Sequence, residues 1–106
     1  MPKFLFETTY KTEAIRGLQK EKGSSRKQAV EKLLASLDGK LEAFYYAMGE
    51  HDVVTIVDLP NAESAAAMSF AGMGTGMVRV KTTPLLTVEE VDRALARKVA
   101  FRGPGQ

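Results

Sequence analysis

The sequence predicts an α+β protein with a ferredoxin-like β-α-β-β-α-β order and an added C-terminal helix. Four segments rich in aromatic and β-branched residues alternate with segments of helical periodicity. The middle two strand segments are joined by only a few residues, as in an antiparallel hairpin. The length of 106 residues, 44% of them apolar, is that of one ordinary folded domain. We therefore expect a single domain over residues 1–106, in which residues 101–106 form a flexible tail.

Each element has a local signal in the sequence. In chain order we expect a strand over 3–10, helices over 13–22 and 25–37, strands over 41–48 and 52–59, a helix over 62–70, a strand over 77–83 and a helix from 87. Thr12, Ser25 and Thr87 are candidate helix N-caps, the last two with capping-box spacing. Gly39 is expected to end the second helix in the left-handed conformation, and Gly49 to adopt positive φ in the hairpin turn.

The predicted strands do not alternate cleanly between apolar and polar residues. Residues 4–6 and 43–48 are continuous apolar runs, and the run over 53–57 is interrupted only by Thr55. Helices on one face would leave the other apolar face without a cover. We expect a second copy of the chain to supply that cover and to form a dimeric α/β barrel. The alternative is that the C-terminal helix, with its apolar side turned inward, folds back over its own sheet.

Composition excludes several classes of function. The net charge is only +2 and the two signs are interspersed, so no basic face for nucleic acid is expected. The absence of Cys rules out disulfides, thiol nucleophiles and thiolate metal sites. His51 is the only histidine, and we expect neither a metal nor a cofactor. No window approaches the ~20 apolar residues of a membrane span, and no signal peptide is expected, so we predict a cytoplasmic protein without a membrane partner.

The hairpin contains the strongest candidate for chemistry. His51 has the only side chain that titrates near neutrality without perturbation, and Asp52 follows it directly, so the two are candidate catalytic residues, with His51 as general acid or base. The simpler interpretation is that Asp52 caps the turn through backbone hydrogen bonds and His51 is an exposed turn residue. Tyr45 and Tyr46, at the end of the preceding strand, are candidate ligand-binding residues.

A second candidate set follows from strand parity. Glu7 lies on one face of the first strand, and Arg79 and Lys81 share one face of the last. These strands are antiparallel neighbours in the ferredoxin-like order, so Glu7 is expected opposite one of the two cations. The charges either bind a small anion in a partly closed cavity or form a structural ion pair. Tyr10, near the strand end, offers a phenol to either pocket or anchors its rim.

The chain resembles the GYD-domain proteins along nearly its whole length. The resemblance rests on Gly23-Ser24-Ser25-Arg26, on the stretch from Leu37 to Tyr45, on Gly49-Glu50-His51-Asp52-Val53-Val54, on Lys81–Thr87 and on Phe101–Gly105. His51 stands where the tyrosine of the family's Gly-Tyr-Asp motif is found. The resemblance implies a small bacterial or archaeal protein, a dimeric α/β-barrel fold and self-association.

Three functions remain open at this stage. The first is a homo-oligomeric small-molecule binding or sensing module with a cavity between sheet and helices. The second, suggested by relatives of the same superfamily, is a cofactor-independent oxygenase or isomerase that uses His51 as acid or base. The third is a structural assembly subunit without a pocket.

Overall fold

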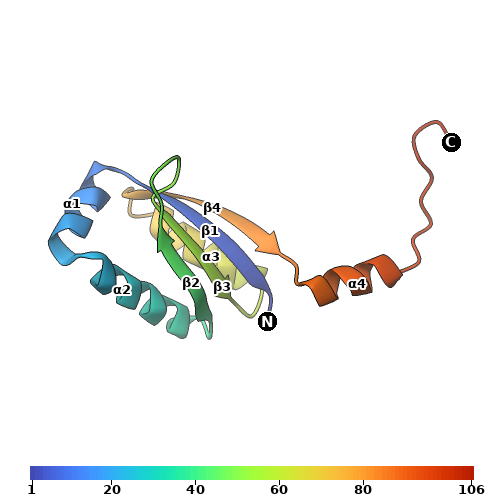
Figure 1. Ribbon diagram of the computed structural model, residues 1–106, viewed down its shortest axis with the longest axis horizontal. Helices are drawn as coiled ribbons and strands as arrows, with labels where there is room; N and C mark the ends of the chain where they lie inside the picture. The colour runs from blue at the N-terminus through green and yellow to red at the C-terminus, as the bar shows by residue number, and fades with distance from the viewer.

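The computed structural model describes residues 1–106 and has the predicted order of elements (Figure 1). These are β1 (Lys3–Tyr10), α1 (Thr12–Glu21), α2 (Gly23–Ser36), β2 (Lys40–Tyr46), β3 (Val53–Asp58), α3 (Ala62–Met73), β4 (Val78–Leu85) and α4 (Val88–Ala96). The four strands form one sheet in the order β2-β3-β1-β4, and all neighbours are antiparallel. The predicted ferredoxin-like α+β fold is therefore confirmed.

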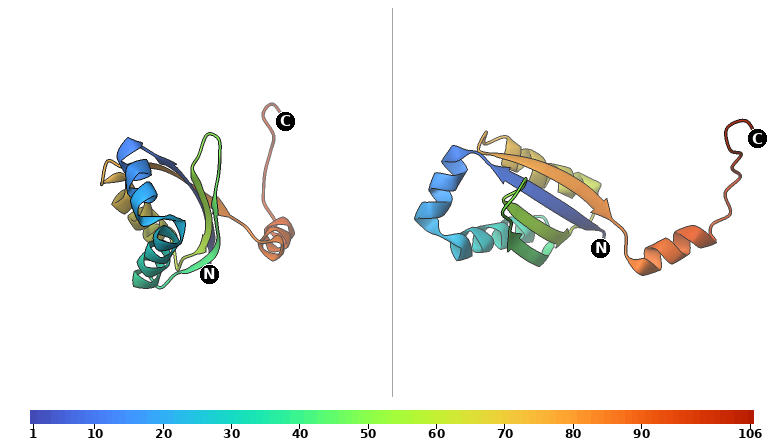
Figure 2. Two further views of the ribbon diagram at one scale, coloured as in Figure 1. Left: turned by 60° about the vertical axis from the view of Figure 1, so that its left-hand side comes forward. Right: turned by 45° about the horizontal axis from the view of Figure 1, so that its top comes forward.

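Helices α1, α2 and α3 lie on one side of the sheet (Figure 2). Alternate residues of the two central strands point toward them and are buried, among them Phe6 and Val57. Leu34 of α2 and Leu59, just after β3, complete a core in which both side chains are fully buried. Only 10 of 106 residues are buried in this chain, so the core is small and much apolar surface is left for other contacts.

The opposite side of the sheet, which we call the open face, carries apolar residues between two charged ends. Cross-strand neighbours share a face, so the register defines its rows. One row contains Ala43, Ile56, Leu5 and Thr83, the next Tyr45, Val54, Glu7 and Lys81. Lys3 and Asp58 lie at one end of this face, and Thr9 and Arg79 lie at the other. No helix of α1–α3 covers this face (Figure 2).

The C-terminal arm, residues 88–106, extends away from the sheet (Figures 1 and 2). The Cα radius of gyration is 17.0 Å, well above the roughly 13 Å of a compact chain of this length. None of the residues in α4 is buried, and Leu95 is 79% exposed. The expectation that the apolar side of the C-terminal helix turns inward and covers its own sheet is therefore wrong for the single chain. Periodicity identified an apolar stripe but not the surface against which it packs.

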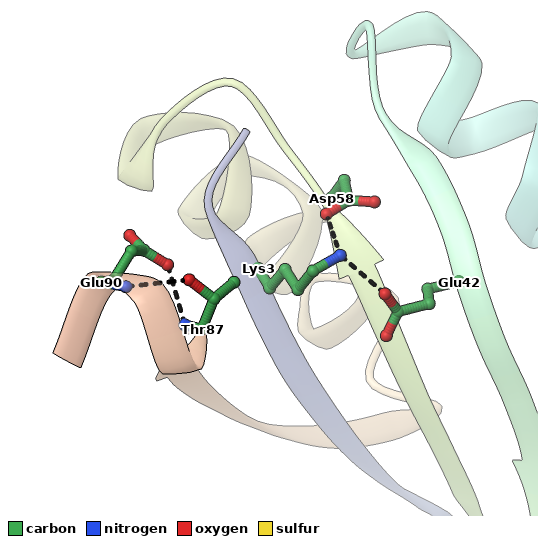
Figure 3. A network of polar contacts seen from close by, with 5 residues as sticks. All are labelled: Lys3, Glu42, Asp58, Thr87 and Glu90. Atoms are coloured by element: carbon green, nitrogen blue, oxygen red, sulfur yellow. Dashed lines mark hydrogen bonds and ion pairs between the residues drawn. The ribbon is translucent and has the colours of Figure 1, made fainter. Parts of the chain in front are cut away.

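Local signals at several turns were overridden by tertiary contacts. Lys11 and Lys22, not Thr12 and Ser25, precede α1 and α2, and neither makes a side-chain cap bond. By contrast, the Thr87 capping box is present as predicted, with the Thr87 hydroxyl accepting from the Glu90 amide and the Glu90 carboxylate accepting from the Thr87 amide (Figure 3). Gly49 does not have positive φ.

Asp38, at φ 57°, takes the left-handed position predicted for Gly39. Gly39 is instead required by close packing, because a Cβ there would lie 2.6 Å from Leu59 Cδ2 and 2.7 Å from the Asp58 carbonyl oxygen. We predict that Gly39→Ala lowers the free energy of unfolding by about 1–3 kcal/mol, as overpacking against backbone does. Gly17→Ala in α1 is the control, since its Cβ meets nothing within 4 Å and should stabilise the helix. Equal denaturation midpoints for Gly39→Ala and the unmodified chain would contradict this account.

Candidate functional site

A cavity of about 410 Å³ lies between the sheet and helices α1, α2 and α3. Its volume is within the range of small-molecule pockets, and 13 of its 20 lining residues are hydrophobic. The sheet contributes side chains from all four strands, and the small residues of α1 and α3 leave room above them. The apolar wall includes Phe6, Leu33, Phe44, Val53, Met68 and Val80. We call this cavity the helix-side pocket.

Few polar groups reach the helix-side pocket. Glu21 and Arg26 both line it and pair with each other, with 3.5 Å between Glu21 Oε1 and Arg26 Nη1. Burial, and after it the neighbouring Tyr46, raise the pKa of the Tyr10 phenol, so that Tyr10 stays protonated at neutral pH and can donate a hydrogen bond. Thr55, 4% exposed, lines the pocket with a hydroxyl that has no hydrogen-bond partner. The pocket is thus mostly apolar, without an unpaired charge, and Thr55 is the one lining residue with a buried side-chain polar atom that has no partner.

The hairpin places His51 on the opposite side of the sheet. Its Nδ1 lies 3.1 Å from the Thr9 hydroxyl oxygen, and its Nε2 lies 3.5 Å from Glu7 Oε2. Glu7 and Thr9 are open-face residues of β1. Thr8 and Tyr10, which alternate with them along the strand, line the helix-side pocket. Both ring nitrogens of His51 therefore contact side chains of β1, and the sheet separates the imidazole from the helix-side pocket.

Asp52 does not orient His51. Its carboxylate accepts a hydrogen bond from the Tyr10 amide at 2.7 Å, and its own amide donates to the Thr8 carbonyl at 2.8 Å. These contacts tie the hairpin to the end of β1. The simpler interpretation is therefore correct that Asp52 makes backbone hydrogen bonds, but its carboxylate bonds to the neighbouring strand and not within the turn, and His51 is partly buried rather than exposed. A catalytic role of His51 and Asp52 remains a prediction, and the carboxylate nearest to the imidazole is that of Glu7.

The structure divides the predicted ligand-binding residues between the two faces. Glu7 lies directly opposite Lys81, as strand parity predicted, and Arg79 lies opposite Thr9 on the same open face. Tyr45 is also on the open face and is 70% exposed. Tyr10 lines the helix-side pocket. Tyr46 is on the helix side, where its hydroxyl donates to the Gly23 carbonyl at 3.0 Å and its pKa is raised chiefly by burial. These six residues therefore cannot form one site within a single chain.

Sequence reasoning missed an ion network on the open face. Lys3 Nζ lies 2.6 Å from Glu42 Oε1 and 2.8 Å from Asp58 Oδ1, so one ammonium joins three strands (Figure 3). The hydrogen bonds to Asp58 and then to Glu42 raise the pKa of Lys3 well above its usual value. A bulge between Leu41 and Ala43 brings the Glu42 side chain to this face, which strict alternation along β2 does not predict.

Sequence reasoning also missed the polar residues of the helix-side pocket. In the sequence, Arg26 belongs to a helix start and Thr55 interrupts an apolar run, and neither pattern indicates a pocket. Thr55 alternates with Val53 and Val57, so parity alone places its hydroxyl on the buried face. That signal was available, whereas the proximity of Arg26 required the packing of α2 against the sheet.

The fold and the pocket define a ferredoxin-like α+β protein with a small-molecule-sized cavity between its sheet and its helices. A family model described as the GYD domain matches residues 4–95, and the chain belongs to the GYD domain family. No curated protein and no solved structure matches the chain. None of the helices has both the length and the apolar character needed to cross a bilayer.

Proposed function

We propose that this GYD-domain protein is a homo-oligomeric small-molecule binding module whose ligand occupies the helix-side pocket. The observation that carries the proposal is the pocket itself, with its predominantly apolar wall and a volume of about 410 Å³. Pockets of this kind, with a few convergent polar groups, are the usual sites of ligand binding in small domains. Glu21, Arg26 and Tyr10 stand among the lining residues and would control what enters.

Self-association is part of the proposal, and its support is the open face. Leu5, Val54 and Ile56 lie side by side on it, between charged ends that resemble the polar rim of an interface. A soluble single chain seldom leaves such an apolar area unused. The C-terminal arm adds a further exposed apolar stripe, which includes Val88 and Leu95. A second copy carries the same two surfaces, so we propose a two-fold dimer that buries the open faces.

The binding proposal is tested by fluorescence titration with 2-naphthol, a rigid, largely apolar probe. The chain has no Trp, so the probe can be excited where the protein does not absorb. We expect saturable binding with one site per chain and a rise in melting temperature with probe concentration. Partition without saturation, or no binding at all, would contradict the proposal.

A second function is favoured by one specific observation, the two contacts that hold the His51 ring. An imidazole that meets the hydroxyl of Thr9 at one nitrogen and the carboxylate of Glu7 at the other is arranged as a base with an orienting partner. On this alternative the protein is a cofactor-independent oxygenase or isomerase with its site on the open face. A dimer would then enclose that site.

His51→Ala separates the two functions. Because His51 lies across the sheet from the helix-side pocket, we predict that the substitution changes the affinity for 2-naphthol less than about twofold, within the range of independent distant sites. The measurement is the same fluorescence titration, with sedimentation as a control for assembly. A large loss of affinity would show that the two faces do not act separately.

A further inference from the structure

The unpartnered hydroxyl of Thr55 is a property of the helix-side pocket that the core does not explain. Thr55 is in the middle of β3, and only 4% of the residue is exposed. Its neighbours across the strands are Phe6 and Phe44, neither of which offers an acceptor or donor in its side chain. Buried polar groups normally have partners, and a valine of the same shape would avoid the cost of leaving one unmade.

Thr82 of β4 provides the internal comparison. It lies on the other side of Phe6, and its hydroxyl is likewise buried without a partner. Thr82 does not line the helix-side pocket, whereas Thr55 does. Any effect that depends on a ligand should therefore appear at Thr55 and not at Thr82.

The charges around the pocket restrict what the ligand can be. Glu21 and Arg26 neutralise each other, and the Tyr10 phenol is uncharged. An ionised ligand would lie against a mostly apolar wall, and the one cation that lines the pocket, Arg26, is already paired with Glu21, so the ligand's charge would lose hydration without a free counter-charge. A neutral ligand avoids this desolvation cost, and burial of its apolar surface favours binding.

We infer that the helix-side pocket takes an uncharged, largely apolar molecule whose single hydroxyl or carbonyl group hydrogen-bonds to the Thr55 hydroxyl. This inference rests on the proposed function and adds to it the chemical class of the ligand. A ~120° rotation about χ1 of Thr55 moves its hydroxyl into another staggered position, so the hydroxyl can turn toward a ligand without movement of the strand. The hydroxyl is then both donor and acceptor, which suits either a hydroxyl or a carbonyl group.

The test compares three probes that share one naphthalene ring and differ in the group at position 2: 2-naphthol, 2-methylnaphthalene and 2-naphthoate. In the unmodified chain we expect 2-naphthoate to bind most weakly. Thr55→Val should reduce the affinity for 2-naphthol relative to 2-methylnaphthalene by about tenfold, the value of one buried hydrogen bond. Thr82→Val should leave that ratio unchanged. Both valine variants should melt at higher temperature than the unmodified chain in the absence of probe, since each removes an unsatisfied polar atom.

The possible failures are distinct. If 2-naphthol binds in the pocket but Thr55→Val leaves the ratio unchanged, or if 2-naphthoate binds best, the inference about ligand class is overturned and the binding function stands. If Thr55→Val melts at lower temperature without probe, the hydroxyl has a partner in the free protein and the inference is also overturned. If no probe binds the unmodified chain, the proposed function itself is overturned.

Discussion

Ile56→Asp is expected to convert the proposed dimer into a single chain. Ile56 lies in the middle of the open face, between Leu5 and Ala43 in the sheet ladder, and is partly exposed in the isolated chain. A carboxylate there remains hydrated in the monomer but loses that hydration among the apolar side chains of Leu5 and Val54 when two open faces meet. The desolvation cost of several kcal/mol should raise the dissociation constant by roughly a hundredfold or more. Sedimentation at micromolar concentration measures the change directly.

Two further variants make this result interpretable. Ala66→Asp places the same charge on the exposed surface of α3 and should leave the dimer intact. Tyr45→Glu is a second disruption of the open face, at a side chain 70% exposed in the single chain, where loss of folding is not expected. If both open-face variants sediment like the unmodified protein, the open face is not the interface.

Gly72→Leu is expected to abolish binding in the helix-side pocket. Gly72 lies in α3 and lines the pocket, and a Cβ there would lie 3.4 Å from Val78 Cγ2 and 3.6 Å from Val80 Cγ2. Both valines also line the pocket, so a leucine side chain extends into the space that the ligand needs. We expect the affinity for 2-naphthol to fall roughly a hundredfold. This corresponds to a loss of about 2–3 kcal/mol of binding free energy, because the leucine either displaces the probe or overpacks the pocket around it.

Gly72→Ala is the matched control for that substitution. Its single added carbon lies at ordinary contact distance, so binding should persist. The change replaces a glycine in the last turn of α3 and should raise the free energy of unfolding, by less than the ~1 kcal/mol of a helix-interior position. Unchanged affinity in Gly72→Leu would place the probe somewhere other than the helix-side pocket.

The fold was predictable because its signals are local. β-Branched and aromatic runs marked the strands, a short connection marked the hairpin, and residues 87–90 contained a complete capping box. The cap positions of α1 and α2 were not predictable in the same way, because Lys22 at φ 73° joins two helices whose angle is set by packing on the sheet. The orientation of α4 was missed for a related reason, since an apolar stripe does not specify which surface covers it.

The candidate site was predictable only in part. Topology and parity predicted Glu7 opposite Arg79 or Lys81, and the observed register selects Lys81. The same parity separates Tyr10 from Glu7, so the division of the predicted residues between two faces was implicit in the sequence. A cavity between the sheet and the helices was one of the hypotheses from the sequence, but its volume and its lining residues could not be predicted. They depend on how far α1 and α3 stand from the sheet and on side chains distant in sequence.

The separation of the two faces of the sheet is tested most directly by methyl NMR during a titration with 2-naphthol. Val53 and Val54 are neighbours in β3, but Val53 lines the helix-side pocket and Val54 lies on the open face with Glu7. We predict large, saturable shifts for the methyl groups of Val53, Val80 and Met68, with those of Val54 and Ile56 nearly unchanged. Shifts confined to Val54 and Ile56, or no saturable shift at any methyl group, would contradict binding in the helix-side pocket.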